Sequence, residues 1–329
     1  MAHEIENNEM FSVRETPWHK QGVVLDNPPS TIEAIRAAKL DFLVEKVPTV
    51  LHPTHAQDLI ETGHYATVRW DGDGNPIILG NVSERYTVIQ NEKAFEVFDR
   101  VLLPEGYTYT TAGAIKRGKK VWILAEAPEH MTVGDDKVMK YVLLVTSHDG
   151  TMNHRLMPTA IRVVCNNTLT WALQRGTEDG FSIRHTGNAE DKLNLAADAL
   201  KWAEGDFNEA RDIWSRMYEL RIEPAAAIHY FERVMPELKK RGDSPTWRKY
   251  FDAIADSFMY GPGNRGETLW HAYQAITEYV DHRRNTAPER AVDYAIFGRG
   301  GKIKRDALSV AHEIIADRVV FPTPQLVTN

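Results

Sequence analysis

From about residue 64 to residue 186, apolar and polar residues alternate with a period close to two, which is typical of strands that have one buried face. The segments "HYATVRW" and "IILGNV" flank "DGDGN", and a turn sequence of this kind favours a tight hairpin. After them, "NEKAFEVFDRVLL" has apolar residues at helical spacing. Four more strands are expected in "YTYTTAGAIKR", "KKVWILAEAP", "MKYVLLVTS" and "RLMPTAIRVV". The middle of the chain is therefore expected to form antiparallel hairpins with a helix packed on them.

The second half of the chain follows a different period. From about residue 188 to residue 316, apolar residues recur every three or four positions, which predicts amphipathic helices. Near the start of the chain, Ser30 or Thr31 should begin a short helix, because Glu33 follows at capping-box spacing. We therefore predict an α+β fold, with an antiparallel, β-hairpin-rich N-terminal and central domain, one or two packed helices, and a mostly α-helical C-terminal region. The expected parts are an N-terminal segment over residues 1–45, the α+β domain over 46–187 and the helical region over 188–329.

Composition agrees with a soluble globular protein. The chain has 329 residues, of which 43% are hydrophobic and 26% are charged, and its length predicts about two domains. No apolar run approaches the roughly 20 residues that cross a bilayer, and the start lacks the basic-then-apolar order of a signal peptide. We expect a cytoplasmic protein without a membrane partner.

Charge is distributed unevenly along the chain. The formal net charge is -7, which argues against a general binder of polyanions. Between Gly106 and Glu190, however, ten Lys and Arg stand against eight Asp and Glu, so this segment carries +2 and the rest of the chain -9. An anionic ligand is therefore expected at the middle of the chain.

The only cysteine, Cys165, ends an apolar strand and precedes a helix that Asn166 or Asn167 should cap and that should run through Leu173. A cysteine at a helix N-terminus can be a nucleophile. A free cysteine in an apolar strand usually behaves as a small buried side chain. We expect Cys165 to belong to the core, and a single cysteine excludes a disulfide framework or a cysteine-based zinc cluster.

Two polar groups raise the question of a metal-dependent hydrolase or nuclease. His148, Asp149 and His154 lie within seven residues of one another at an expected turn, where two histidines and a carboxylate suit several divalent ions. Ser147 completes the residue types of a triad, but adjacent residues cannot aim their side chains at one another as a triad requires. A polar turn is the alternative.

The second group lies on an expected helix, where Glu278, Asp281 and His282 share one face. Di-metal bundles use such faces in pairs, and no second such helix is found in the sequence. A polar helix end that complements the helix dipole is the alternative. Close by, "FGRGGKIKRDAL" is glycine-rich and basic, which predicts either a flexible phosphate-binding arm or a solvated loop.

The strongest basic feature is the turn "KRGKK" between two expected strands. One strand carries Tyr109 and the other Trp122, and a single nucleic-acid strand needs cations for its phosphates and rings for its bases. Arg155 and Arg162 of a later strand are seven positions apart, so they share a face only if a bulge at Pro158 resets the register. The expected phosphate contacts are Lys116, Arg117, Lys119, Lys120, Arg155 and Arg162, and the expected stacking rings are Tyr109 and Trp122. The alternative is a solvated hairpin tip with aromatic residues in the core.

Several segments together resemble a known family. In chain order they are "MAHEIE", "ETPWHKQGVVLD", "GNVSERYTVIQNEKAFEVFD", "MPTAIRVVCNNTL", "IRHTGN" and "WHAYQAITEYVDH". They resemble the phage/plasmid-like protein family, whose members more often have a glycine where this chain has Lys20. The resemblance implies a gene carried by phages, prophages or plasmids and a bacterial host, and it implies no activity. In outline the strands and helix are also similar to single-strand annealing recombination proteins, which bind DNA in an oligomeric ring.

These observations lead to one expected function and two alternatives. We expect a non-enzymatic protein of a phage or other mobile genetic element that binds single-stranded DNA, self-associates and promotes annealing, with no cofactor and no metal. The first alternative is a protein-interaction or anti-defence factor that acts through its helical half. The second is the metal-dependent hydrolase or nuclease described above.

Overall fold

The structure is a computed structural model of the chain. It describes residues 9–14, 22–54, 58–152, 155–162, 167–170, 181–182, 204–205, 207–284, 294 and 298–316. The chain divides into two compact units, each made of three segments. The first unit comprises Met1–Pro128, Val142–Met157 and Asp179–Trp202, and the second comprises Glu129–Tyr141, Pro158–Glu178 and Ala203–Asn329.

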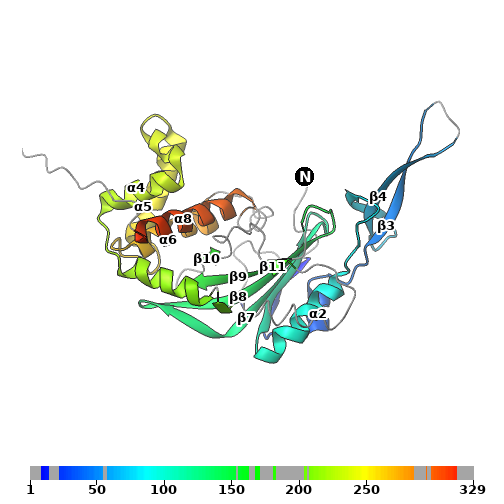
Figure 1. Ribbon diagram of the computed structural model, residues 1–329, viewed down its shortest axis with the longest axis horizontal. Coiled ribbons are helices and arrows are strands. Elements are labelled where there is room, and N and C mark those ends of the chain that lie inside the picture. The colour runs from blue at the N-terminus through cyan, green and yellow to red at the C-terminus, as the bar shows by residue number, and fades with distance from the viewer. Residues whose placement is uncertain are drawn as a thin grey trace, which may run out of the picture. The chain divides into compact units, whose positions relative to one another are not determined.

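An eight-stranded sheet has the strand order β10-β9-β8-β7-β6-β1-β2, and β11 also pairs with β9. Its strands are β1 (Met10–Val13), β2 (Val23–Leu25), β6 (Thr108–Ile115), β7 (Lys120–Val133), β8 (Asp136–Ser147), β9 (Arg155–Arg162), β10 (Asn167–Thr170) and β11 (Phe181–Ser182). Pairing is antiparallel between β1 and β6, β6 and β7, and β9 and β10, whereas β1 and β2 are parallel. The four strands that alternation predicted, now β6 to β9, are confirmed (Figure 1).

A second sheet of the first unit has the order β3-β4-β5. Its strands are β3 (Glu45–Leu51), β4 (Ile60–Trp70) and β5 (Pro76–Val82). The expected "DGDGN" turn joins β4 to β5, where Asp71 Oδ1 accepts from the backbone N–H groups of Asp73 (3.0 Å) and Asn75 (2.7 Å). Gly74 adopts a φ of 80°, which favours glycine at the turn. The predicted hairpin is therefore confirmed.

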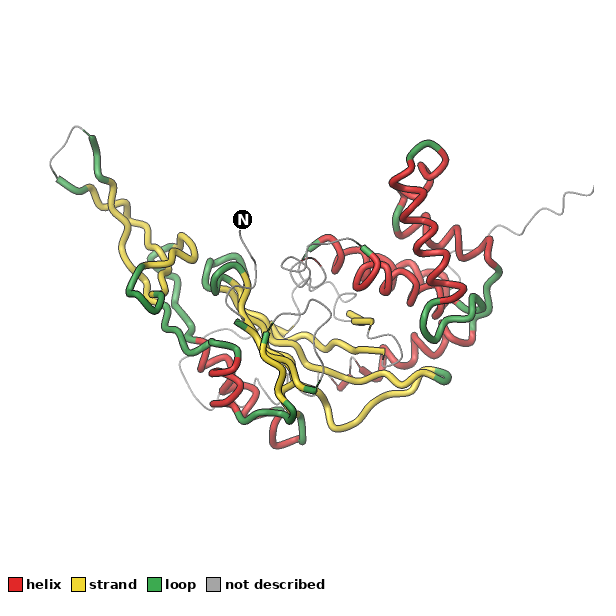
Figure 2. Tube along the Cα trace, turned by 180° about the vertical axis from the view of Figure 1, so that it is seen from behind, coloured by secondary structure: helices red, strands yellow, loops and turns green. Residues whose placement is uncertain are grey.

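The hairpin of β3 and β4 continues beyond β5 (Figures 1 and 2). β5 pairs only with residues 65–70 of β4, whereas β3 pairs with β4 as far as Ile60. The distal part of this hairpin, called the β3–β4 arm, is therefore a two-stranded ribbon. Four large aliphatic side chains are exposed at its end: Val50 (46%), Leu51 (57%), Leu59 (58%) and Ile60 (51%).

Two helices and a 3-10 turn complete the described part of the first unit: α1 (Thr31–Ala37), α2 (Asn91–Val101) and η1 (Leu103–Glu105). The capping box of α1 is formed as expected, because the Ser30 N–H donates to Glu33 Oε2 at 2.8 Å. The apolar positions of α2 place Phe95 and Phe98 against Tyr109 of β6, with ring centroids 5.5 Å and 6.0 Å away. This packing makes the core between α2 and the sheet.

Helices dominate the second unit (Figure 2). Residues 207–219 are helical, and the later elements are α4 (Pro224–Val234), η2 (Pro236–Gly242), α5 (Pro245–Tyr260), α6 (Leu269–Glu278), the π-helical turn η3 (Tyr279–Arg283) and α8 (Arg299–Ile315). Every residue of α6 is buried, because α4, α5, α8 and β10 all pack on this helix. The predicted α+β fold, strand-rich first and helical afterwards, is confirmed.

Two local expectations are wrong. Residues Asn167–Thr170 form β10, which pairs with β9 from Arg162 to Thr159, and do not start a helix. Two β-branched threonines and the available partner strand outweigh the capping signal of the asparagines. The glycine-rich basic segment is also not a loop, because α8 begins at Arg299 and buries Lys304 completely. Within the described residues, no helix combines the length and apolar character needed to cross a membrane.

Candidate functional site

The basic turn predicted from "KRGKK" is a tight hairpin end between β6 and β7. The Lys119 N–H donates to the Lys116 carbonyl at 3.3 Å, and the two central residues, Arg117 and Gly118, have φ values of 61° and 91°. These are the signs of a type I′ hairpin turn. Lys116 also has a positive φ, 53°. Two cationic residues therefore occupy the left-handed region, which side chains with a Cβ rarely enter.

The hairpin tip rests on Phe42 and on Arg69 of β4 in the first unit. A Cβ on Gly118 would lie 2.9 Å from Phe42 Cζ and 3.3 Å from Arg69 Nη1, so the turn backbone packs closely on these two side chains. The Arg117 side chain is exposed, whereas Lys116, Lys119 and Lys120 are half-buried. Hydrogen bonds from Asn75 lower the pKa of Asp71, and the charge of Arg117 adds to this effect. One of the four cations is therefore close to a carboxylate.

The two rings expected to stack on bases are buried. Tyr109 is 1% exposed, and its hydroxyl donates to Asp99 Oδ1 at 2.8 Å. Burial raises the pKa of Tyr109. Trp122 is 3% exposed and covers Gly113, where an added Cβ would lie 2.4 Å from the indole Cη2. The expectation of exposed stacking rings on this hairpin is wrong, because both rings belong to the core.

Four residues singled out in the sequence lie partly or wholly outside the described residues. Arg155 and Arg162 lie on β9, where their backbones pair with Ser182 and Asn167. Their side chains lie outside the part of the chain that the structure describes, as do the whole of His154 and Cys165. The phosphate contacts expected of the two arginines stay a prediction.

His148 is a structural residue of the first unit. It is 1% exposed, and its Nε2 lies 2.8 Å from Asn91 Oδ1. Its backbone N–H donates to the Lys119 carbonyl, and its carbonyl accepts from the Thr67 hydroxyl. Burial, aided by the charge of Arg69, lowers the pKa of His148 to about 4. The imidazole is neutral at physiological pH and contacts α2, while the His148 backbone holds the hairpin tip.

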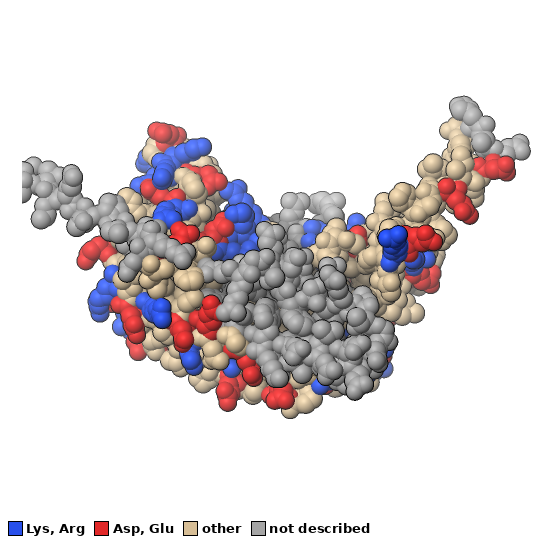
Figure 3. Space-filling view, viewed as in Figure 1, with Lys and Arg blue, Asp and Glu red and all other residues tan. Residues whose placement is uncertain are grey.

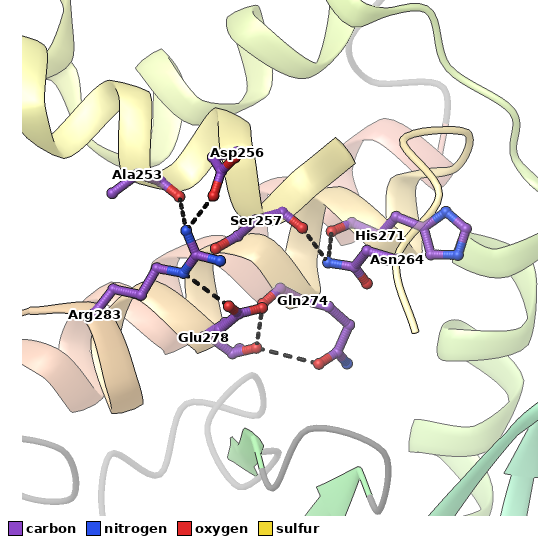
Figure 4. A network of polar contacts seen from close by, with 9 residues as sticks. Ala253, Asp256, Ser257, Asn264, His271, Gln274, Glu278 and Arg283 are labelled. Carbon is purple, nitrogen blue, oxygen red and sulfur yellow. Dashed lines mark hydrogen bonds and ion pairs between the residues drawn. The ribbon is translucent and has the colours of Figure 1, made fainter. Parts of the chain in front are cut away.

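The carboxylates of the second metal candidate are buried and paired with cations, Glu278 with Arg283 (Figure 4) and Asp281 with Lys304. Glu278 is 5% exposed and accepts from Arg283 Nε at 2.8 Å. Asp281 accepts from Lys304 Nζ at 2.8 Å, and Lys304 is 0% exposed. The polar face expected at this helix end is therefore buried, and its two carboxylates form ion pairs. Among the residues that the structure describes, no group of three or more His, Cys, Asp or Glu could hold a metal.

The same network ties α5 to α6. Arg283 also donates to Asp256 of α5, and Asn264 Nδ2 donates to the Ser257 carbonyl at 2.8 Å (Figure 4). Gly261 fits closely beside Glu278, since an added Cβ would lie 2.5 Å from Glu278 Oε2. These contacts fix the loop between the two helices and support the segment that follows α6.

That segment contributes to a group of rings and arginines that the sequence analysis missed. We call it the cation–aromatic cluster, and its members are Trp247, Tyr250, Tyr279, Arg284, Tyr294 and Arg299. Its members come from α5, from the residues that follow α6 and from the start of α8, which lie far apart in the sequence. The available signal was that "TWRKY" and "GRGGK" each combine cations with a ring or with glycines, but nothing local joins the two.

Comparisons with known proteins give one family. No curated protein and no solved structure matches the chain. The profile of a family described as "Domain of unknown function (DUF932)" matches residues 78–297, about two thirds of the sequence. The match extends over the β6–β7 hairpin, α5 and α6. The chain therefore belongs to the DUF932 family.

Proposed function

We propose that the chain is a non-enzymatic protein of a phage or other mobile genetic element that binds single-stranded DNA in the cytoplasm of a bacterial host. The observation that carries this proposal is the conformation of the β6–β7 turn. Lys116 and Arg117 have positive φ values at positions where Gly or Asn would meet less steric resistance. The presence of cations at strained positions favours a role for their charge.

The chemistry of the turn favours phosphate as the ligand. Lys116, Arg117, Lys119 and Lys120 gather within five residues, and lysine and arginine bind nucleic acid by displacing the counterions of its phosphates. Because Tyr109 and Trp122 are buried, this turn would hold a strand by its backbone alone. Contacts of this type fix the position of a strand and carry no sequence information.

Binding through phosphates also supports an annealing activity. A strand that is held by its backbone keeps its base edges free to pair with a second strand. Neutralised phosphates also reduce the repulsion between the two strands. We propose that the protein promotes annealing in this way, with several copies arranged along one strand.

The test removes charges from the turn and keeps its left-handed backbone conformation. In the full chain, Lys116→Asn with Arg117→Asn removes two charges, and asparagine tolerates the left-handed conformation. Affinity for a fluorescent oligothymidylate is measured by anisotropy at several salt concentrations. The slope of log K against log salt should become shallower by about 0.7 for each phosphate that the protein no longer neutralises. The double change Lys119→Glu, Lys120→Glu should weaken binding further.

The matched control is Lys93→Glu with Arg100→Glu, on exposed positions of α2 in the same unit. It changes the net charge as much as the two glutamates in the turn do and should leave affinity close to wild type. A wild-type chain that does not bind, or equal losses in the turn and on α2, would overturn the proposal.

A specific observation favours a second candidate, an interaction protein. The end of the β3–β4 arm exposes Val50, Leu51, Leu59 and Ile60, and exposed aliphatic groups at a sheet edge are typical of protein interfaces. Residues 47–68 contain Asp58 and Glu61 but no Lys or Arg, so the arm brings no cation of its own to this contact. We propose a second copy of the chain as this partner, because the proposed annealing activity also needs self-association.

Light scattering after gel filtration tests this second candidate. The wild type should form an oligomer, and Leu51→Asp with Leu59→Asp should reduce its mass to that of the monomer. The control Ile78→Asp changes another exposed aliphatic residue, 63% exposed, in β5 of the same sheet. A monomeric wild type would exclude self-association.

A further inference from the structure

The cation–aromatic cluster is a continuous row of contacts in the second unit. The rings of Trp247 and Tyr250 meet edge to face, with centroids 5.4 Å apart and planes at 84°. Tyr250 then contacts Tyr279, with centroids 5.6 Å apart. The Arg284 guanidinium lies 6.0 Å from the Tyr250 ring centroid and 4.7 Å from that of Tyr294. Each ring in this row therefore has another ring or a cation as a neighbour.

Most members of the cluster reach solvent. Trp247, Tyr250, Arg284 and Tyr294 are half-buried, and the Arg299 side chain is 52% exposed. Rings held rigidly at the surface, with arginine beside them, are what binds the bases of a single strand. This is the combination that the β6–β7 hairpin lacks.

The buried member of the cluster has a donor without a partner. Tyr279 is 1% exposed, and its hydroxyl makes no hydrogen bond with any described residue. Burial raises the pKa of Tyr279, while the charges of Arg284 and Arg299 oppose this change. The hydroxyl therefore stays protonated, and the charges of both arginines act on it. An acceptor delivered to this place would satisfy it.

The start of α8 adds backbone donors to the same place. Gly298 precedes the helix and has no side chain to cap it, and the first N–H groups of a helix have no partner within it. A Cβ on Gly300 would lie 2.5 Å from Tyr294 Cε1, so the ring packs against the first turn. The N-terminus of a 17-residue helix attracts anions, and here two arginines accompany it.

Carboxylates near the cluster are already engaged. Glu237 accepts from Arg299 Nη2 at 2.9 Å, which uses one edge of that guanidinium and orients it. Asp281 is bound to Lys304. On the face that Figure 3 shows, the second unit carries Lys and Arg among Asp and Glu. An anion at the cluster would be held mainly by local contacts.

From these contacts we infer that the cation–aromatic cluster binds single-stranded nucleic acid. One backbone phosphate would lie at the first turn of α8 between Arg284 and Arg299, and one base would stack on Tyr250 or Trp247. The inference rests on the proposed function and names the rings that contact the bases. It also predicts tolerance of base sequence, since every base has a face that can stack.

A pair of variants isolates the ring. Tyr250→Leu and Tyr250→Phe both remove the hydroxyl, and only the first removes the ring. Anisotropy with the full chain and fluorescent oligothymidylate should show affinity reduced at least about fivefold in Tyr250→Leu and unchanged in Tyr250→Phe. Arg284→Ala should weaken binding as well. The control Arg221→Ala removes an equal charge from the same unit, at a side chain that is 80% exposed, and should bind as wild type.

The outcomes separate this inference from the proposed function. A wild type that does not bind the oligonucleotide overturns both. Binding that falls in Lys116→Asn with Arg117→Asn, but is equal in Tyr250→Leu and Tyr250→Phe, overturns only the role of the cluster. If thermal melting shows that Tyr250→Leu is unfolded, Trp247→Leu and Trp247→Phe provide the same comparison.

A measurement on the wild type needs no variant. An oligonucleotide with 5-bromouracil is cross-linked by ultraviolet light, and the modified peptide is identified by mass spectrometry. Cross-links in residues 245–260 or at Tyr294 support the inference. Cross-links confined to residues 108–133 overturn it.

Discussion

The β6–β7 hairpin and the cation–aromatic cluster share the same residue types but differ in where the rings lie. In the hairpin the cations reach solvent and Tyr109 and Trp122 are buried. In the cluster, Trp247, Tyr250 and the arginines all reach the surface. A strand side chain faces either the core or solvent, and the rings of β6 and β7 face the core. A ring at the edge of a helix's buried stripe can keep one face exposed.

The largest expected effect comes from truncating one ring of each region. Trp122→Ala should lower the free energy of unfolding by about 3–5 kcal/mol, as for other buried aromatic residues. Trp247→Ala should cost about 1 kcal/mol, the usual effect of a point change, because its ring is half-buried. Urea unfolding followed by circular dichroism measures both. Equal losses would remove the distinction between the two regions.

The buried ion pair of Lys304 and Asp281 joins α8 to the segment that follows α6. Lys304→Ala leaves Asp281, which is 6% exposed, as a buried charge without its lysine, and should cost about 3–5 kcal/mol. Lys304→Met with Asp281→Leu should recover most of this loss, because matched apolar groups often replace a buried pair at little cost. If Lys304→Ala is as stable as the wild type, the pair of Lys304 and Asp281 does not hold α8 in place.

An effect of pH is expected at the hairpin and not at the cluster. The folded pKa of His148 is lowered to about 4, below its value of about 6.5 in an unfolded chain. Between these pH values the unfolded state binds one more proton than the folded state. The contribution of His148 to the free energy of unfolding is therefore complete above pH 6.5 and is lost as the pH falls toward 4. The loss should reach about 3 kcal/mol. In His148→Gln, the urea midpoint should depend less on pH between 6.5 and 4 than in the wild type. An equal dependence on pH in both proteins would contradict the role of His148.

The smallest expected effect is that of Arg117→Asn, which distinguishes the backbone conformation of the turn from its charge. Arg117→Asn should raise the free energy of unfolding by about 0.5 kcal/mol, since asparagine adopts the left-handed region more readily. The same variant should bind oligonucleotide more weakly than wild type. A variant that is both less stable and weaker in binding would indicate damage to the turn and not the removal of a charge that binds phosphate.

The sequence predicts the elements whose pattern is local and long. The strands from β6 to β9 and the helices α2, α4, α5 and α6 follow from their periods. β1 and β2 have four and three residues, too few to show a period. The segment of β10 resembles a helix start because asparagine caps helices, while its strand partner β9 is not a local signal.

The sequence predicts which residue types form the site but not which of their side chains are exposed. The alternation of apolar and polar residues shows that β6 has two different faces. It does not show that Phe95 and Phe98 of α2 cover the face that carries Tyr109. The helical period places Glu278 and Asp281 on one face correctly, but Lys304, the partner of Asp281, lies more than twenty residues later. The cluster was missed for the same reason: tertiary packing brings "TWRKY" and "GRGGK" together, and neither segment is distinctive alone.

The β3–β4 arm has a consequence for motion. From Ile60 to about His64, β4 pairs with β3 only, and the end of the arm exposes its aliphatic side chains. An isolated two-stranded ribbon is marginally stable in water, so the amide hydrogens of Val50 and Leu51 should exchange through local opening. The arm can then detach its strands while the eight-stranded sheet stays intact, and a bound partner would slow this exchange.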